Sequence, residues 1–142
     1  MKNIYIILII LAVVLIGFVG WKLGSPLFLD KVVNEEIIGT DSNPEMIILQ
    51  GSFIDADASH KTSGTAKIVV IDEKEYLSFE DFETTNGPDL YVYLSKDTQA
   101  SDFVNLGKLK GNIGNQNYEI PQGTNLESYN NVIIWCRAFS VL

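Results

Sequence analysis

The sequence predicts an all-β domain, an antiparallel sandwich or barrel, preceded by one N-terminal transmembrane helix. An uncharged apolar stretch occupies residues 3–21. From residue 46 onward, short runs rich in Ile, Val, Tyr and Phe alternate with Gly, Asn, Asp and Pro, which is the pattern of strands joined by turns. No segment after residue 46 has a helical period. The 142 residues are therefore expected to hold a single core.

The stretch NIYIILIILAVVLIGFVGW, residues 3–21, has the length and composition of a membrane-spanning helix. As a helix it is roughly 28 Å long, which matches the hydrocarbon core of a bilayer. Tyr5 and Trp21 near its ends suit the interfacial aromatic belt, and Lys2 favours an N-terminus inside, although Lys22 flanks the other end.

A cleaved signal peptide is the alternative interpretation of this stretch. Its apolar region is usually shorter and is followed by a small-residue cleavage site, which residues 18–24 do not offer. We therefore expect residues 1–22 to be an uncleaved single-pass anchor in the cell membrane, with the C-terminal domain outside the cytoplasm.

Residues 23–45 predict a polar linker, because turn and breaker residues lie near both of its ends. Within it, the piece LFLDKVVNEEII at 27–38 has loose amphipathic spacing, which allows a short helix. The linker leads to the all-β domain expected over residues 46–142.

Seven runs of strand-forming residues are spaced along that domain. They are Met46–Ile54, Thr65–Ile71, Glu75–Phe82, Leu90–Ser95, Phe103–Leu109, Asn117–Ile120 and Asn131–Leu142. Alternation puts Leu90, Val92 and Leu94 on one face of their strand and the tyrosines between them on the other. In the last run both faces are apolar, so we expect a strand that is central or covered on both sides, with Cys136 buried on its aliphatic face.

Composition excludes several classes of function. Downstream of residue 21, nine Lys and Arg oppose 18 Asp and Glu, a net charge of −9, so no nucleic-acid partner is expected. One Cys and one His are too few for a blue-copper site, a c-type haem attachment or an iron–sulfur cluster, and we expect no dedicated metal site. An ordinary hydrolase is not expected either, since only His60 could serve a nucleophile as base.

The remaining candidate for chemistry is the single thiol, Cys136. It could act as a redox-active thiol, as the axial ligand of a haem supplied from outside, or as half of an intermolecular disulfide. The alternative is a small buried apolar residue, a common fate of free Cys. His60 lies in the polar turn SHKTSG and is either a solvent-facing loop residue or a second ligand or proton-transfer partner for whatever Cys136 binds. Proximity to Cys136 would favour the second.

Two further polar segments are interpreted as connections. Thr84 to Asp89, TTNGPD, is a tight turn before a strand, and GNIGNQNY at 111–118 is similar to a hairpin loop with Gly and Asn at positive φ. The second is not a phosphate loop, because no Lys-Ser or Lys-Thr follows it.

Several strings together resemble the DM-thirteen domain family. They are GSF at 51–53, HKTSGTAKI at 60–68, TTNGPDLYVYLS at 84–95, LGKLKGNIGNQNYEIP at 106–121 and YNNVIIWCRAFSV at 129–141. The resemblance covers about residues 46–142 and is specific, because the motifs occur in the family's order. Family members usually continue with a Phe-Gly-x-Ala segment, whereas this sequence ends at Leu142, so either the last strand is short or the sequence given is truncated.

The resemblance implies an all-β extracytoplasmic domain, often found beside DOMON domains, that is redox-active through one cysteine of a Trp-Cys strand. That cysteine corresponds to Cys136, as a bare thiol or as a haem ligand. The function hypothesis is therefore a membrane-anchored electron-transfer or thiol-redox module with a redox partner protein, in which Trp135 and His60 join Cys136 in binding a cofactor. The competing hypothesis is a non-catalytic cell-surface binding or assembly module in which Cys136 is structural.

Overall fold

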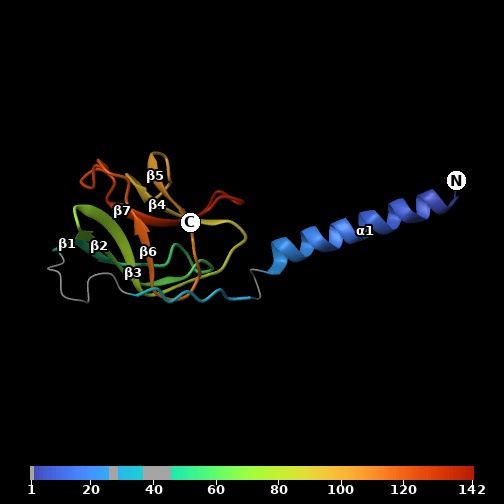
Figure 1. The fold of residues 1–142 in the computed structure, drawn as a ribbon, viewed down its shortest axis with the longest axis horizontal. Coiled ribbons are helices and arrows are strands. Elements are labelled where there is room, and N and C mark those ends of the chain that lie inside the picture. The colour runs from blue at the N-terminus through green and yellow to red at the C-terminus, as the bar shows by residue number, and fades with distance from the viewer. Residues whose placement is uncertain (1, 26–28, 37–45) are drawn as a thin grey trace.

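The computed structural model describes residues 2–25, 29–36 and 46–142. Helix α1 (Lys2–Gly24) stands apart from a β-domain, as Figure 1 shows. Residues Ile4–Lys22 of α1 are long and apolar enough to cross a membrane, and none of this span is buried against the domain. Lys22 lies in the last turn, where a cation complements the helix dipole. The predicted apolar helix is confirmed, and it fits a single-pass anchor or a signal sequence.

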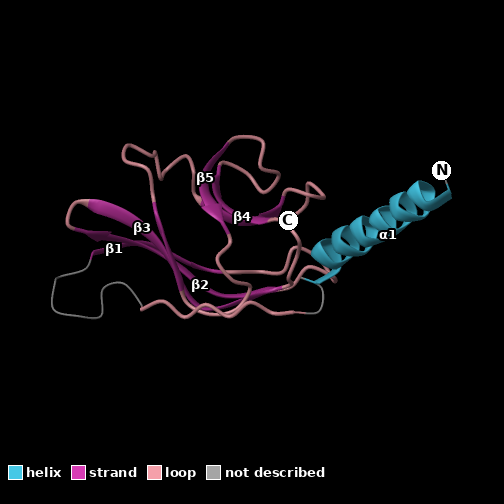
Figure 2. Ribbon diagram, turned by 45° about the vertical axis from the view of Figure 1, so that its right-hand side comes forward, coloured by secondary structure: helices cyan, strands magenta, loops and turns pink. Residues whose placement is uncertain are grey.

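Seven strands form two antiparallel sheets, which confirms the predicted fold class (Figure 2). The first sheet has the order β1-β2-β3-β6 and the second the order β5-β4-β7. The strands are β1 (Met46–Ser52), β2 (Thr62–Ile71), β3 (Lys74–Thr84), β4 (Leu90–Ser95), β5 (Phe103–Lys108), β6 (Gln116–Glu119) and β7 (Asn131–Cys136). Every predicted run overlaps one of them, although β2, β3 and β6 begin before their predicted runs.

The predicted last strand, 131–142, is too long. Strand β7 ends at Cys136, residues 137–140 turn, and the chain folds back so that the Cys136 N–H donates to the Val141 carbonyl over 2.8 Å. Ser140 takes a positive φ of 55°, a conformation that belongs to turns and not to strands. Apolar composition alone did not reveal this turn, because it contains no Gly or Pro.

The segment expected to be a hairpin loop at 111–118 is instead a crossover. It connects β5 in one sheet to β6 in the other, so these two strands do not pair. Gly114 does have the expected positive φ, 101°. Gly111 and the Asn residues of the segment have no positive φ, so the predicted turn chemistry holds only at Gly114. The predicted topology was wrong, because the residues of a loop do not say which sheet the next strand joins.

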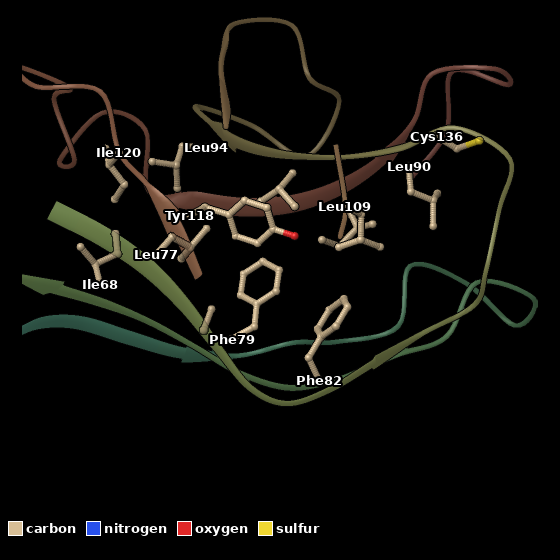
Figure 3. Packing of buried hydrophobic residues seen from close by; sticks show 13 residues of the cluster. Ile68, Leu77, Phe79, Phe82, Leu90, Leu94, Leu109, Tyr118, Ile120 and Cys136 are labelled. Atoms are coloured by element: carbon tan, nitrogen blue, oxygen red, sulfur yellow. The ribbon is translucent and has the colours of Figure 1, made fainter. Parts of the chain in front are cut away.

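The core lies between the sheets, and Figure 3 shows its packing. Leu90, Val92 and Leu94 of β4 face inward as predicted, with Cys136, Ile134 and Val132 of β7 as their cross-strand partners. From the facing sheet, Leu77, Phe79 and Phe82 are at most 1% exposed. The Phe79 ring lies 4.8 Å from that of Phe82 and 5.4 Å from that of Tyr118, measured between centroids. Aromatic contacts at these distances add to the stability from burial alone.

Residues 29–36 are extended and lie against the crossover loop, where the sequence allowed a short helix over 27–38. Val32 forms a parallel bridge with Ile113, and the N–H groups of Val33 and Glu35 donate to the carbonyls of Ile113 and Asn115 over 2.9 and 3.0 Å. These hydrogen bonds to another segment of the chain satisfy the backbone N–H groups of Val33 and Glu35 without a helix. Residues 27, 28, 37 and 38 of the predicted helix lie outside the described residues.

Glycines in the crossover loop make room for this segment. A Cβ at Gly111 would lie 2.4 Å from the Lys31 carbonyl oxygen, and one at Gly114 would lie 1.9 Å from that of Val33. The Glu35 carboxylate then accepts hydrogen bonds from Lys110 Nζ at 2.7 Å and from the Asn117 N–H at 2.8 Å. The part of the predicted linker that the structure describes is therefore docked on the domain.

Candidate functional site

A cavity of about 710 Å³ lies between the two sheets, where β1 and β7 are the edge strands. Its inner walls are aliphatic: Ala66, Ile68 and Leu77 come from the first sheet, and Leu90, Leu94 and Ile134 from the second. The loops at 53–60 and 84–88 and the C-terminal turn complete it. A largely apolar cavity of this size with a few polar groups at its rim is the usual form of a ligand or cofactor site.

Cys136 contributes its side chain to this cavity from the last position of β7. Its backbone is fixed on both sides, because it pairs with Leu90 in the sheet and with Val141 across the C-terminal turn. The residue is 6% exposed and belongs to the core cluster, and Figure 3 places it at one end of that cluster beside Leu90. The predicted burial of Cys136 is confirmed, and it argues against a disulfide between two chains.

His60 lines the same cavity from the loop between β1 and β2. Its Nδ1 lies 2.7 Å from Asp57 Oδ2, and its side chain is 43% exposed. Asp57 also accepts the backbone N–H groups of Ser59 and His60. The His60 side chain, followed by these two N–H groups, lowers the pKa of Asp57 to about 2. A carboxylate on Nδ1 fixes the ring and leaves Nε2 as the nitrogen for a ligand, the arrangement usual for metal-binding His.

The loop that carries His60 is held at both ends. Phe53 packs its ring 4.9 Å from that of Phe79, and the Asp55 carboxylate accepts the Thr62 N–H over 3.0 Å and Lys61 Nζ over 2.8 Å. These contacts order a segment whose polar composition predicts only a turn. The structure thus brings the two chemically competent side chains of the sequence analysis, Cys136 and His60, to one cavity.

Trp135 is not among the residues that line the cavity. It alternates with Cys136 along β7 and pairs with Tyr91, on the outer face of the second sheet. On that face Arg137 lies 4.5 Å above the Tyr91 ring, and Tyr93 stacks on Phe103 with centroids 4.1 Å apart. The aromatic residues expected near Cys136 therefore form a separate row on the other side of the sheet.

Sequence reasoning missed three contributors to the site. Asp57 was visible as an Asp three residues before His60, a spacing that allows an Asp side chain to accept the N–H groups that follow it. Ile54 and Phe139 rim the cavity from a loop and from the C-terminal turn, and no sequence pattern marks them, because their position depends on how the two sheets face each other.

Within the described residues there is no group of three or more His, Cys, Asp or Glu side chains that could hold a metal ion. Cys136 and His60 line a cavity whose inner walls are aliphatic, a setting that suits a largely apolar ligand.

The β-domain that holds this cavity belongs to a family of electron-transfer domains. The family model described as electron transfer DM13 matches residues 52–142, and the chain belongs to that family. A search of curated proteins found no match, and neither did a search of solved structures.

Proposed function

We propose that the chain is a membrane-anchored, extracytoplasmic electron-transfer domain whose redox group is Cys136, as a thiol or as a haem ligand. Membership of the DM13 family supports the electron-transfer role in general. The observation that carries the specific proposal is that the only thiol of the chain lines the large interior cavity together with the only histidine.

The residues of the cavity fit a haem. A volume of about 710 Å³ lies within the range of cofactor and ligand sites, roughly 300–1,000 Å³. Cys136 and His60 would hold the haem, with Asp57 orienting the imidazole through Nδ1. A bound haem would supply a one-electron carrier. The aliphatic walls would exclude water, and the two backbone pairings of Cys136 would hold its sulfur in place.

The test is the visible spectrum of the full-length chain in detergent after incubation with haemin and removal of the excess. We expect a Soret band that shifts on addition of dithionite, because thiolate ligation changes with the iron oxidation state. Cys136→Ser should abolish the bound species, and His60→Ala should change its spectrum. Trp135→Phe is the matched control, since it alters the adjacent residue on the opposite face of β7 and should leave the band intact.

A spectrum without a Soret band in the unchanged chain would exclude the haem form. Reaction of Cys136 with a small disulfide reagent under native conditions would then support the bare thiol, because the cavity reaches the surface at residues such as Phe139. If the chain neither shows a Soret band nor reacts with the reagent at Cys136, a redox role for Cys136 is refuted.

The second candidate function is a non-catalytic binding or assembly module on the cell surface. It is favoured by the packing of Cys136 within the core cluster, as a small apolar residue would pack. Under this alternative, Cys136→Ser lowers the free energy of unfolding by about 1 kcal/mol and changes nothing else.

The proposed location has its own test. Lys2 at the N-terminal flank of α1 supports an N-terminus inside the cell. In intact right-side-out vesicles, an added protease should degrade the β-domain, and it should spare the domain if the orientation is reversed. An intact mass that includes residues 1–22 would establish that the anchor is retained, and a shorter mass would identify a cleaved signal peptide.

A further inference from the structure

The cavity reaches the surface among exposed apolar side chains. Ile54, Phe139 and Val141 all line it, and they are 84%, 67% and 38% exposed. Large apolar residues that surround the mouth of an apolar cavity indicate contact with an apolar partner, because water would otherwise cover them at a cost in free energy. These three residues are called the rim below.

The rim lies at the end of the domain that receives α1. The Ser25 carbonyl accepts the Leu29 N–H over 2.9 Å, and the Leu29 carbonyl accepts Asn86 Nδ2 over 2.8 Å. Asn86 is itself part of the cavity wall, so two hydrogen bonds connect the end of the helix to the cavity. Figures 1 and 2 show the C-terminal turn on the side of the domain that faces α1.

The docked segment fixes this arrangement. Residues 29–36 follow the end of α1 closely and are held by backbone hydrogen bonds to Ile113 and Asn115 and by the contacts of Glu35 with Lys110. Residues 29–36 are therefore part of the domain surface and not of a flexible linker. The same end therefore stays close to the membrane that α1 crosses.

Charge at this end is compatible with a phospholipid surface, although the domain as a whole is acidic. Among the residues that the structure describes, three cations downstream of residue 21 have no carboxylate within 4.0 Å, and all belong to this end: Lys22, Lys31 and Arg137. Of the carboxylates at this end, Asp55, Asp57 and Asp89 are paired with Lys61, His60 and Lys108, whereas Asp30, next to Lys31, has no cation within 4.0 Å among the described residues and accepts a hydrogen bond from the Asn112 side chain. Unpaired cations beside exposed apolar residues are the usual composition of a membrane-contacting surface.

We propose that this end of the domain rests on the bilayer, with Ile54 and Phe139 in the interfacial layer and lipid phosphates at Lys31 and Arg137. The inference rests on the anchor role of α1 in the proposed function and is independent of the role of Cys136. The end of the cavity that Cys136 and the rim line then faces the membrane, and apolar molecules dissolved in the bilayer reach Cys136 through that end.

The test measures the depth of single tryptophans in the full-length chain, reconstituted in nanodiscs of phosphatidylcholine and phosphatidylglycerol. The chain has two tryptophans, so Trp135→Phe leaves Trp21 alone as a reporter of α1. In the background Trp21→Phe plus Trp135→Phe, Phe139→Trp and Ile54→Trp report on the rim. Gln122→Trp is the matched control, because Gln122 is exposed at the opposite end, two residues after Ile120, whose N–H binds the Glu75 carbonyl.

Lipids brominated near the headgroup end of their acyl chains should quench the Phe139→Trp or Ile54→Trp protein by roughly half, since interfacial side chains reach that depth. The Gln122→Trp protein should keep its fluorescence. If Trp21 is quenched while the rim proteins behave like the Gln122→Trp control, the membrane contact of the rim is refuted and the anchor stands. If Trp21 is not quenched either, the anchor itself fails. Circular dichroism confirms that each variant is folded, and two rim positions keep the test valid if one variant does not fold.

Discussion

The two long edges of the sandwich are built in different ways. Along the edge where β5 contacts β6, the crossover loop and residues 29–36 close the gap between the sheets, and the buried Gln116 amide exchanges hydrogen bonds with Gly111 at 3.1 and 2.7 Å. Along the edge formed by β1 and β7, the gap remains as the cavity with Cys136 and His60. Stability is therefore expected to depend on the closed edge, and ligand chemistry on the open one.

Phe79→Ala, near the closed edge, should cause the largest loss of stability. Phe79 is fully buried on β3, next to β6, and its ring contacts those of Phe53, Phe82 and Tyr118. Removing it should lower the free energy of unfolding by about 3–5 kcal/mol. Urea denaturation followed by circular dichroism measures the change. A loss in the free energy of unfolding no larger than that caused by a substitution at an exposed position would contradict the expectation that stability depends on this edge.

Gly114→Ala should have the next largest effect. The added Cβ would collide with the Val33 carbonyl, and Ala is strained at a φ of 101°. We expect a loss of about 2 kcal/mol together with release of residues 29–36. Protease cleavage between α1 and the domain should become faster than in Gly107→Ala, where the Cβ meets no neighbour although φ is also positive, 117°. Equal cleavage of the two variants would show that the crossover glycine does not hold the segment.

Glu35→Gln should weaken the docking of residues 29–36 on the domain by about 1 kcal/mol. The variant loses the ion pair with Lys110 and a charge-assisted hydrogen bond from the Asn117 N–H at a partly exposed site. Burial raises the pKa of Glu35, but Lys110 and the Asn117 N–H outweigh it, so the pKa is lowered from 4.5. A carboxyl with a lowered folded pKa stabilises the fold above its ordinary pKa, and this contribution disappears as the pH falls below about 4.5. The difference in stability between the unchanged chain and the variant should therefore shrink in acid, and a constant difference from pH 7 to acid would contradict this.

Ile54→Ser, on the rim of the open edge, should have the smallest effect on stability. Ile54 is 84% exposed, so the free energy of unfolding in detergent should change by less than about 0.5 kcal/mol. A larger loss would mean that the rim is part of the core and that the two edges do not differ as described.

The sequence was sufficient for features that depend on local pattern. Strand alternation placed Leu90, Val92 and Leu94 inward and buried Cys136, as the structure has them. Features that depend on long-range pairing were not predictable. The crossover at 111–115, the docking of residues 29–36 and the shared cavity of Cys136 and His60 all join segments far apart in the chain. The turn after Cys136 was missed because its residues, Arg-Ala-Phe-Ser, include no Gly, Pro, Asn or Asp, and the one Ser is a weaker turn former.

The docked segment limits how far the domain can travel from its anchor. As a flexible coil, the 23 residues predicted as linker would let the domain explore a root-mean-square distance of roughly 25 Å. With residues 29–36 pinned to the crossover loop, four residues of the chain, 25–28, lie between the end of α1 and the docked segment. Under the proposed anchoring, encounters with an electron donor or acceptor become a search in two dimensions, in which lateral diffusion within the membrane sets the collision rate, and a membrane-bound partner is favoured over a soluble one.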